Sequence, residues 1–161
     1  MLIARSAAFI AVLAIAAPAG AQLLDRKDLS LATALTIATT AAETCKGQGH
    51  RVSVAVVGRN AEILVHLRGD QTAPHTMENS FRKAYTARTF RIPSGEFAQR
   101  VKDNPTSGQA HLTNVIANQG ALPIKVGEDV VGAAGASGAP GGEKDEACIK
   151  AGLDKVADQL K

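Results

Sequence analysis

The sequence predicts an α/β domain in which helices cover a mostly antiparallel sheet, and three observations support this fold class. Apolar residues recur at helical spacing over residues 31–45 and again near the C-terminus. Two pairs of short strands are each joined by a tight turn, at Arg59-Asn60 and at Gly127-Glu128. Because turns rather than crossover helices join these strands, the pairs should be antiparallel, and the helices should cover the faces of the sheet.

Residues 1–21 are predicted to be a signal peptide. Arg5 supplies a positive start, residues 7–17 form an apolar run, and Ala19-Gly20-Ala21 matches an A-x-A cleavage site. The apolar run is shorter than the roughly 20 residues that span a bilayer, which argues against a membrane anchor. We therefore expect a periplasmic or secreted protein with no membrane span after cleavage. Residues 22–161 are expected to form a single domain.

The first helix is expected after Ser30, which can cap it, and before Gly47 and Gly49, which should end it. Residues 51–58 are apolar and β-branched, as is typical of a strand buried on both faces. Residues 61–68 should form the partner strand, with Ile63, Val65 and Leu67 on one face and Leu64 and His66 on the other. The apolar face of the helix is predicted to comprise Leu31, Ala34, Leu35, Ala38, Ala42 and Cys45.

A second helix is expected over residues 75–90, after a loop at residues 69–74. Pro93 should break it, and Ser94 could cap a short helix that continues through Arg100. The polar, glycine-containing segment at residues 102–121 is expected to be mostly loop. The predicted core-facing residues of the second helix are Met77, Phe81, Ala84 and Tyr85.

Residues 123–126 and 129–135 should form the second hairpin. Its second strand is rich in glycine and alanine, which would let another element approach closely. Gly141-Gly142 should open the final helix, whose predicted apolar face comprises Ile149, Leu153, Val156 and Leu160.

The two cysteines, Cys45 and Cys148, are predicted to form a disulfide. An exported chain meets an oxidising compartment, where a disulfide persists. If the first and last helices lie antiparallel on one face of the sheet, the two cysteines adjoin. A bridge that closes a loop of roughly 100 residues would stabilise the fold by about 4 to 5 kcal/mol in the chain-entropy model. The alternative is a pair of buried thiols that act as small hydrophobic side chains.

Composition argues against a nucleic-acid partner. Without Arg5, the 18 basic residues become 17, against 15 acidic residues, a formal charge of +2. This bias is too weak to indicate phosphate-backbone binding. Only 3% of the residues are aromatic and none is tryptophan, so platforms that stack on bases are not expected. The sequence contains no nucleophile elbow, P-loop, dinucleotide fingerprint or H-E-x-x-H motif, and we expect no enzymatic activity.

Residues 68–91 hold the best candidate binding site. His75 is placed at a helix start, where free N–H groups and the positive end of the helix dipole favour an acidic ligand. The same helix carries Arg82, Lys83 and Arg88, which could bind carboxylates or could simply be a solvated surface. Arg82 and Lys83 are adjacent, so they cannot point the same way. Among the other histidines, His50 is expected at the surface, His66 within the sheet, and His111 in a loop where either a functional or a solvated role is open.

Several segments give the chain a family resemblance. They read H-R-V-S-V-A-V-V-G, R-G-D-Q-T-A-P-H-T-M-E-N-S-F-R-K-A-Y-T-A-R-T-F and G-E-D-V-V-G-A-A-G-A-S-G-A-P-G-G. On these segments the chain resembles the GlcG/HbpS heme-binding family over nearly all of residues 22–161. The resemblance implies an antiparallel sheet of about five strands flanked by helices. It also implies a homo-oligomer, in some members an octamer. Some members bind heme, exported ones serve as sensors beside a sensor kinase, and others accompany glycolate or diol metabolism.

The leading interpretation is an exported heme-binding protein that acts in heme sensing, storage or transfer. In this interpretation His75 is the iron ligand and Arg82, Lys83 or Arg88 pairs with the propionates. Thr76 and Tyr85 complete the predicted heme site. The alternative is an oligomeric interaction module that docks to a membrane sensor or a metabolic partner without heme, which the scarcity of aromatic residues favours slightly. An enzyme acting on heme or a small hydroxy acid ranks last, since no nucleophile or acid–base pair supports it.

Overall fold

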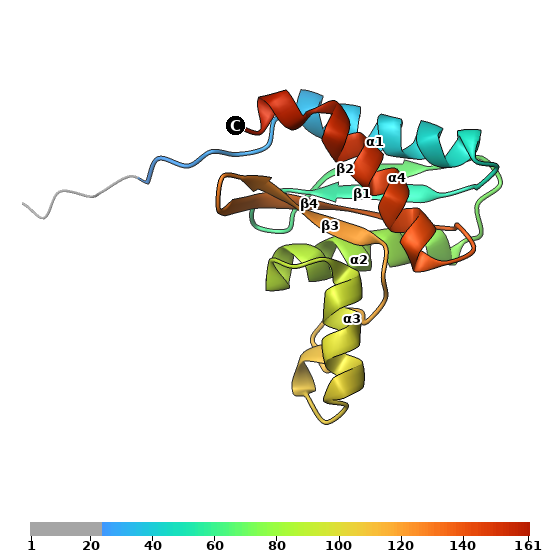
Figure 1. Ribbon diagram of the computed structural model, residues 1–161, viewed down its shortest axis with the longest axis vertical. Coiled ribbons are helices and arrows are strands. Elements are labelled where there is room, and N and C mark those ends of the chain that lie inside the picture. The colour runs from blue at the N-terminus through green and yellow to red at the C-terminus, as the bar shows by residue number, and fades with distance from the viewer. Residues whose placement is uncertain (1–23) are drawn as a thin grey trace, which may run out of the picture.

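The computed structural model describes residues 24–161, so the predicted signal peptide at residues 1–21 lies outside the described residues. This part of the chain forms helices and strands in the order predicted from the sequence (Figure 1). Two short 3₁₀ helices, Gly108–His111 and Ala157–Gln159, accompany them. The main elements are α1 (Leu31–Gly47), β1 (Ser53–Val57), β2 (Ile63–Arg68), α2 (His75–Phe90), α3 (Ser94–Asp103), β3 (Ala121–Val126), β4 (Asp129–Ser137) and α4 (Gly142–Lys155). None of the described helices is both long and apolar enough to cross a membrane.

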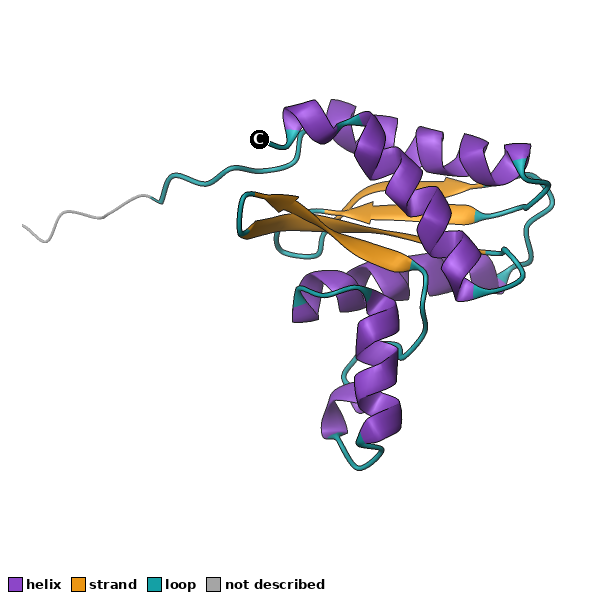
Figure 2. Cartoon of the chain, viewed as in Figure 1, coloured by secondary structure: helices purple, strands orange, loops and turns teal. Residues whose placement is uncertain are grey.

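The sheet has the strand order β2-β1-β4-β3, and every neighbouring pair is antiparallel. The predicted antiparallel sheet flanked by helices is therefore confirmed (Figure 2). The expected number of about five strands is wrong, because the described residues form four. The segment between α3 and β3 does not supply another strand. It is polar and lacks the alternating apolar pattern of a strand, and it folds into turns and a 3₁₀ helix.

Helices cover both faces of the sheet, with α1 and α4 on one face and α2 on the other (Figure 1). The larger core lies between the sheet and the α1–α4 pair, where Ile37, Val54 and Ile149 are fully buried. A smaller core on the α2 side contains Ala55 and Ala84. All five residues of β1 are buried, as predicted for a strand covered on both faces. Figure 1 shows α3 extending away from the sheet on the α2 side.

A β-bulge changes the predicted faces of β2. Val56 pairs with Val65, but the next residue, Val57, pairs with Ile63, so Leu64 is the extra residue. Ile63 therefore shares the α2 side with Val57, whereas Leu64 packs against the core under α1 and α4. The prediction that Ile63, Val65 and Leu67 share one face is wrong at Ile63, and the prediction that Leu64 shares the face of His66 is also wrong, because strict alternation fails at a bulge.

The close approach of α2 to β4 corrects the predicted core face of α2 only in part, because Ala84 is buried and Phe81 packs against the smaller core as predicted. A Cβ atom at Gly135 would lie 2.6 Å from the Ser80 carbonyl oxygen and 2.8 Å from the Ala84 nitrogen, so the glycine is needed for this packing. Small and polar side chains occupy the contact, while the larger Met77, Phe81 and Tyr85 are only half-buried at its edges. The buried residues of α2 are Thr76, Ser80, Lys83, Ala84, Thr86 and Ala87.

A similar contact sets the buried face of α1. A Cβ atom at Gly152 of α4 would lie 2.5 Å from the Ile37 carbonyl oxygen, so the two helices pack backbone to backbone. Leu31 and Leu35, predicted to face the core, are instead exposed, because the small-residue side of α1 faces α4. The buried residues of α1 are Ala34, Ile37, Ala38, Ala41 and Cys45.

The predicted disulfide between Cys45 and Cys148 is present, with Cα atoms 5.6 Å apart and both side chains fully buried. It joins the end of α1 to the first half of α4, which confirms the antiparallel arrangement of these helices. Ser30 caps α1 as predicted, accepting a hydrogen bond from the Thr33 N–H. The predicted cap at Ser94 is wrong, because the Ser94 hydroxyl accepts the backbone N–H of Ala121 and thereby ties α3 to the start of β3.

Candidate functional site

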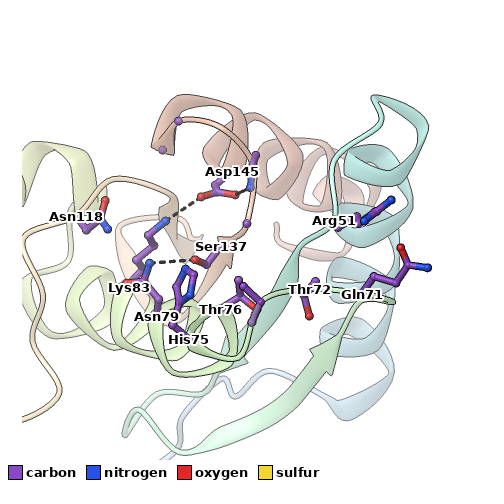
Figure 3. Close-up of a pocket in the computed structure, with 15 residues that line it drawn as sticks. Arg51, Gln71, Thr72, His75, Thr76, Asn79, Lys83, Asn118, Ser137 and Asp145 are labelled. Carbon is purple, nitrogen blue, oxygen red and sulfur yellow. Dashed lines mark hydrogen bonds and ion pairs between the residues drawn. The ribbon is translucent and has the colours of Figure 1, made fainter.

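A pocket of about 470 Å³ lies where the start of α2, the end of β4 and the start of α4 meet, and we refer to it as the α2–α4 pocket (Figure 3). Its walls are mainly polar. Three of the lining residues, Gly138, Ala139 and Gly141, come from the loop that joins β4 to α4. The side chains that line it include Arg51, Gln71, Thr72, His75, Thr76, Asn79, Lys83, Asn118, Ser137 and Asp145.

Two helix N-termini contribute to this pocket. His75 is the first residue of α2 and Gly142 is the first residue of α4, and both line the pocket. Neither helix has a side-chain hydrogen bond at its N-cap, which is Pro74 for α2 and Gly141 for α4. The first N–H groups of a helix have no partner within the helix and carry partial positive charge. The pocket therefore favours an anionic group.

A buried ion pair forms the inner wall of the pocket. Lys83 Nζ lies 2.8 Å from Asp145 Oδ2, and each side chain is only 3% exposed. The Lys83 ammonium also donates to the carbonyl oxygen of Ala136, and the N–H of Ala139 donates to Asp145 Oδ1. The pair thus connects α2, the end of β4 and the start of α4. The two charges compensate each other, so Lys83 is not a free cation.

Neighbouring side chains hold the rest of the wall in place. Asn79 Nδ2 donates to Ser137 Oγ at 2.9 Å, which links α2 to the end of β4 (Figure 3). Thr76 Oγ1 lies 2.8 Å from Ser53 Oγ and also donates to the carbonyl oxygen of Ala73. His75 is exposed and makes no side-chain hydrogen bond within residues 24–161. Its imidazole is therefore available to a ligand in the pocket.

The other predicted site residues on α2 divide into two groups. Arg82 points away from Lys83, as expected for adjacent helix residues, and lines a smaller hollow of about 270 Å³ together with His75, Glu78 and Asn79. Arg82 Nη2 donates to the carbonyl oxygen of Val115 at 2.8 Å, and Nη1 donates to Glu78 Oε1. Tyr85 and Arg88 line neither the α2–α4 pocket nor this hollow.

Arg88 lies near the C-terminal end of α2 in a partly buried setting. Desolvation lowers the pKa of Arg88, and the nearby positive charge of Arg91 lowers it further. Its Nε is buried and has no hydrogen-bond partner among the described residues. Tyr85 packs its ring against Phe81, with ring centroids 5.8 Å apart.

Sequence reasoning did not identify several residues of the pocket, above all Arg51 and Asp145. Arg51 lines both the α2–α4 pocket and an adjoining pocket of about 500 Å³ beside the end of α1. Asp145 is an acidic residue in the first turn of α4, which the sequence pattern could have singled out, but its partner Lys83 is 62 residues away in the chain. No local pattern connects residues at such a separation.

The remaining histidines occupy different places. His66 Nε2 lies 3.0 Å from the Met77 carbonyl oxygen and 3.2 Å from Ser80 Oγ, so His66 is a sheet residue that contacts α2. His50 lines the adjoining pocket, and His111 is exposed in the 3₁₀ helix after α3. Within residues 24–161, no group of three His, Cys, Asp or Glu side chains is arranged to hold a metal ion.

Comparisons with known proteins relate the chain to one family. The model of a family described as "Haem degrading protein HbpS-like" matches residues 29–154. The crystal structure of HbpS is 34% identical, with a TM-score of 0.81, and the match covers 88% of this chain and 99% of that one. A double mutant of HbpS from Streptomyces reticuli is also 34% identical, covering 91% of this chain and 98% of its own, with a TM-score of 0.81. Among curated proteins, none matches the chain in sequence.

More distant solved structures share the fold. The Klebsiella pneumoniae protein ORFY is 24% identical with a TM-score of 0.78, and the match covers 85% of this chain and 96% of that one. A complex of PduOC with heme is 20% identical with a TM-score of 0.72, and the match covers 78% of this chain and 93% of that one. At these identities the likeness concerns the fold alone.

Proposed function

Because this chain belongs to the HbpS-like family, we propose that it is an exported heme-binding protein that acts in heme sensing, storage or transfer. The observation that carries the proposal is the exposed imidazole of His75 at the edge of a pocket that favours anions. PduOC, which shares the fold, has a structure as a heme complex. The family match and this pocket together support heme as the ligand class.

The pocket chemistry fits two parts of a heme molecule. A histidine is a common axial ligand of heme iron, and His75 offers a free imidazole. The two uncapped helix N-termini suit propionate carboxylates. Apolar groups on the walls are small, such as Ala73 and Ala139, so one chain can receive an edge of the porphyrin but does not enclose the ring.

The other side chains predicted to contact heme are described by their present partners and positions. Lys83 is held by Asp145, and Arg82 by Val115 and Glu78, so pairing with a propionate would require an exchange of these bonds. Thr76 is buried beside His75 and supports the helix start. Tyr85 and Arg88, further along α2, would meet only a ligand that extends beyond the α2–α4 pocket.

A heme titration of the mature chain, residues 22–161, tests the proposal. The Soret band should change saturably on addition of hemin. His75→Ala should shift the band of the complex and weaken binding tenfold or more, which corresponds to about 1.4 kcal/mol. His111→Ala is the matched control, since His111 is an equally exposed histidine outside the α2–α4 pocket. If His111→Ala abolishes binding while His75→Ala has no effect, the ligand assignment is wrong.

We propose that the protein binds heme and does not degrade it, although the description of the family names heme degradation. The purified complex would be incubated with ascorbate in air, and the Soret band and released iron would be measured. A Soret band that persists as it does for heme bound to serum albumin is expected. Protein-dependent loss of the band together with release of iron would instead indicate a heme-degrading enzyme.

We also propose that the protein is exported and works as a homo-oligomer beside a membrane sensor kinase. The motives are the A-x-A site at residues 19–21 and the family membership. The intact mass of periplasmic protein should correspond to a chain that begins at Gln22. A mass that retains residues 1–21 would argue against this export route.

A further inference from the structure

Arg51 occupies the junction of two pockets. It lies just before β1 and lines both the α2–α4 pocket and the adjoining pocket beside α1. Figure 3 shows Arg51 and Gln71 together at one end of the α2–α4 pocket and Asn118 at the opposite end. His75 lies beside Asn79, between these two ends, and the Arg51 side chain points away from it, toward the rim. A ligand that contacts His75 and extends toward Arg51 would therefore follow the pocket toward that end.

The backbone holds Arg51 in a defined position against the end of β4. Ser53, two residues later, pairs with Ser137 in the sheet. The next residue, Gly138, has a positive φ of 135° and approaches the Arg51 carbonyl so closely that a side chain at this position would collide with it. The strand pairing and this contact fix the position of the Arg51 backbone, from which the side chain extends. The guanidinium itself remains exposed.

Of the two basic side chains that line the α2–α4 pocket, Lys83 and Arg51, only Arg51 has a positive charge that is not paired with a carboxylate among the described residues. Lys83 is neutralised by a buried carboxylate at 2.8 Å. Arg51 has no ion-pair partner within the described residues, and it lines the same pocket as the first residues of α2 and α4. A guanidinium binds a carboxylate through two parallel hydrogen bonds, which a lysine cannot reproduce.

We propose that Arg51 binds a propionate of the heme that His75 ligates. The inference rests on the proposed heme binding and assigns the propionate to a residue outside α2. Because Arg51 would contact the carboxylate and not the iron, its loss should change affinity without changing the Soret position. Its loss should also matter only for a heme that has free carboxylates.

The test compares hemin with hemin dimethyl ester, in which both propionates are esterified, in one detergent-containing buffer. Wild type should bind hemin at least about tenfold more tightly than the ester. Arg51→Gln should lose about this factor for hemin and bind the ester as wild type does. Arg51→Lys should be intermediate, because it keeps the charge but not the paired donors. Arg91→Gln, which removes an exposed arginine outside the pocket, should behave as wild type.

The outcomes separate this inference from the proposed function. If wild type binds hemin saturably and Arg51→Gln binds it equally well, the Arg51 assignment is overturned while heme binding stands. Equal weakening for hemin and for the ester would show a structural role for Arg51 and would also overturn the assignment. If wild type binds no hemin saturably, both the inference and the proposed function fail.

Discussion

At the scale of single residues, the Lys83–Asp145 pair determines how the wall of the α2–α4 pocket is held. Both groups are almost completely buried, and each also bonds to the backbone near the end of β4. Buried ion pairs are weak evidence for stability relative to apolar residues, but removal of one partner leaves an uncompensated buried charge. The pair should therefore matter most when only one of its members is changed.

Lys83→Met should lower the free energy of unfolding by about 3 to 5 kcal/mol, because Asp145 is left buried without its counter-ion. The free energy of unfolding should fall clearly less in the double variant Lys83→Met/Asp145→Asn, because the buried charge is gone and an amide oxygen can still accept the Ala139 N–H. Urea denaturation of the three proteins measures the difference. A single variant within about 1 kcal/mol of wild type would contradict this account.

Glu146, next to Asp145 on α4, should make stability depend on pH. Burial raises the pKa of Glu146 above its ordinary value of 4.5, and the hydrogen bond from Gln119 opposes this only in part. An acid with a raised pKa in the folded state contributes stability below the unfolded pKa and loses it as the pH rises through the folded pKa. At pH 7 the ionised carboxylate is therefore destabilising.

Glu146→Gln should raise Tm relative to wild type at pH 7, and the difference should vanish below about pH 4, where the wild-type carboxyl is protonated in both states. Thermal denaturation at the two pH values checks this. Glu128→Gln, at an exposed position in the β3–β4 turn, controls for the loss of one negative charge. A Glu146→Gln variant that is no more stable than wild type at pH 7 would show that solvent screens this carboxylate.

At the scale of elements, the disulfide connects α1 to the helix that forms one side of the pocket. Cys148 lies one turn after Asp145, so the bridge fixes the first half of α4 against α1. The bridge closes a loop with a sequence separation of 103 residues. All four strands of the sheet and all of α2 and α3 lie inside this loop.

The double variant Cys45→Ala/Cys148→Ala should lose about 4 to 5 kcal/mol of stability by the chain-entropy model. Chemical denaturation of the variant and of oxidised and reduced wild type measures this. Because both sulfurs are fully buried, native protein should show no reaction with a thiol reagent after mild glutathione treatment. Rapid reduction of the native protein would contradict the expected protection by burial.

At the scale of the whole molecule, the small residues of β4 no longer indicate an oligomer contact. Sequence reasoning used them to support assembly, but Gly135 is covered by α2 of the same chain. The family membership still motivates the prediction. Leu31 and Leu35 also support assembly, because they lie one turn apart on the outer side of α1 and are 59% and 41% exposed.

We expect the mature protein to be a homo-oligomer larger than a dimer, with Leu31 and Leu35 in a contact between copies. Light scattering at micromolar concentration should show this mass, and Leu31→Glu/Leu35→Glu should reduce it. Leu112→Glu, at a leucine 53% exposed in the segment after α3, is the matched control for added charge. A clean monomer mass for wild type would reject the prediction.

Much of this fold follows from local patterns in the sequence. Periodicity and turn residues predicted the order of helices and strands, the start of α2 at His75, the cap at Ser30 and the hairpin turn at Gly127-Glu128. The compartment and the expected helix arrangement predicted the Cys45–Cys148 bridge. These features depend on residues close together in the chain, or on a general packing rule, so a single sequence carries them.

Only the tertiary structure decided which residues share the pocket and which faces are buried. Lys83 looked like a ligand-binding cation, but Asp145, 62 residues away, neutralises it. Arg51 showed no local signal and gained its place only when β1 and β4 paired. The buried face of α2 consists mainly of alanine, serine and threonine, and not of its largest apolar residues, because Gly135 lets the helix approach the sheet. Such properties depend on which segments, distant in the chain, come into contact in the fold, and local periodicity does not specify those contacts.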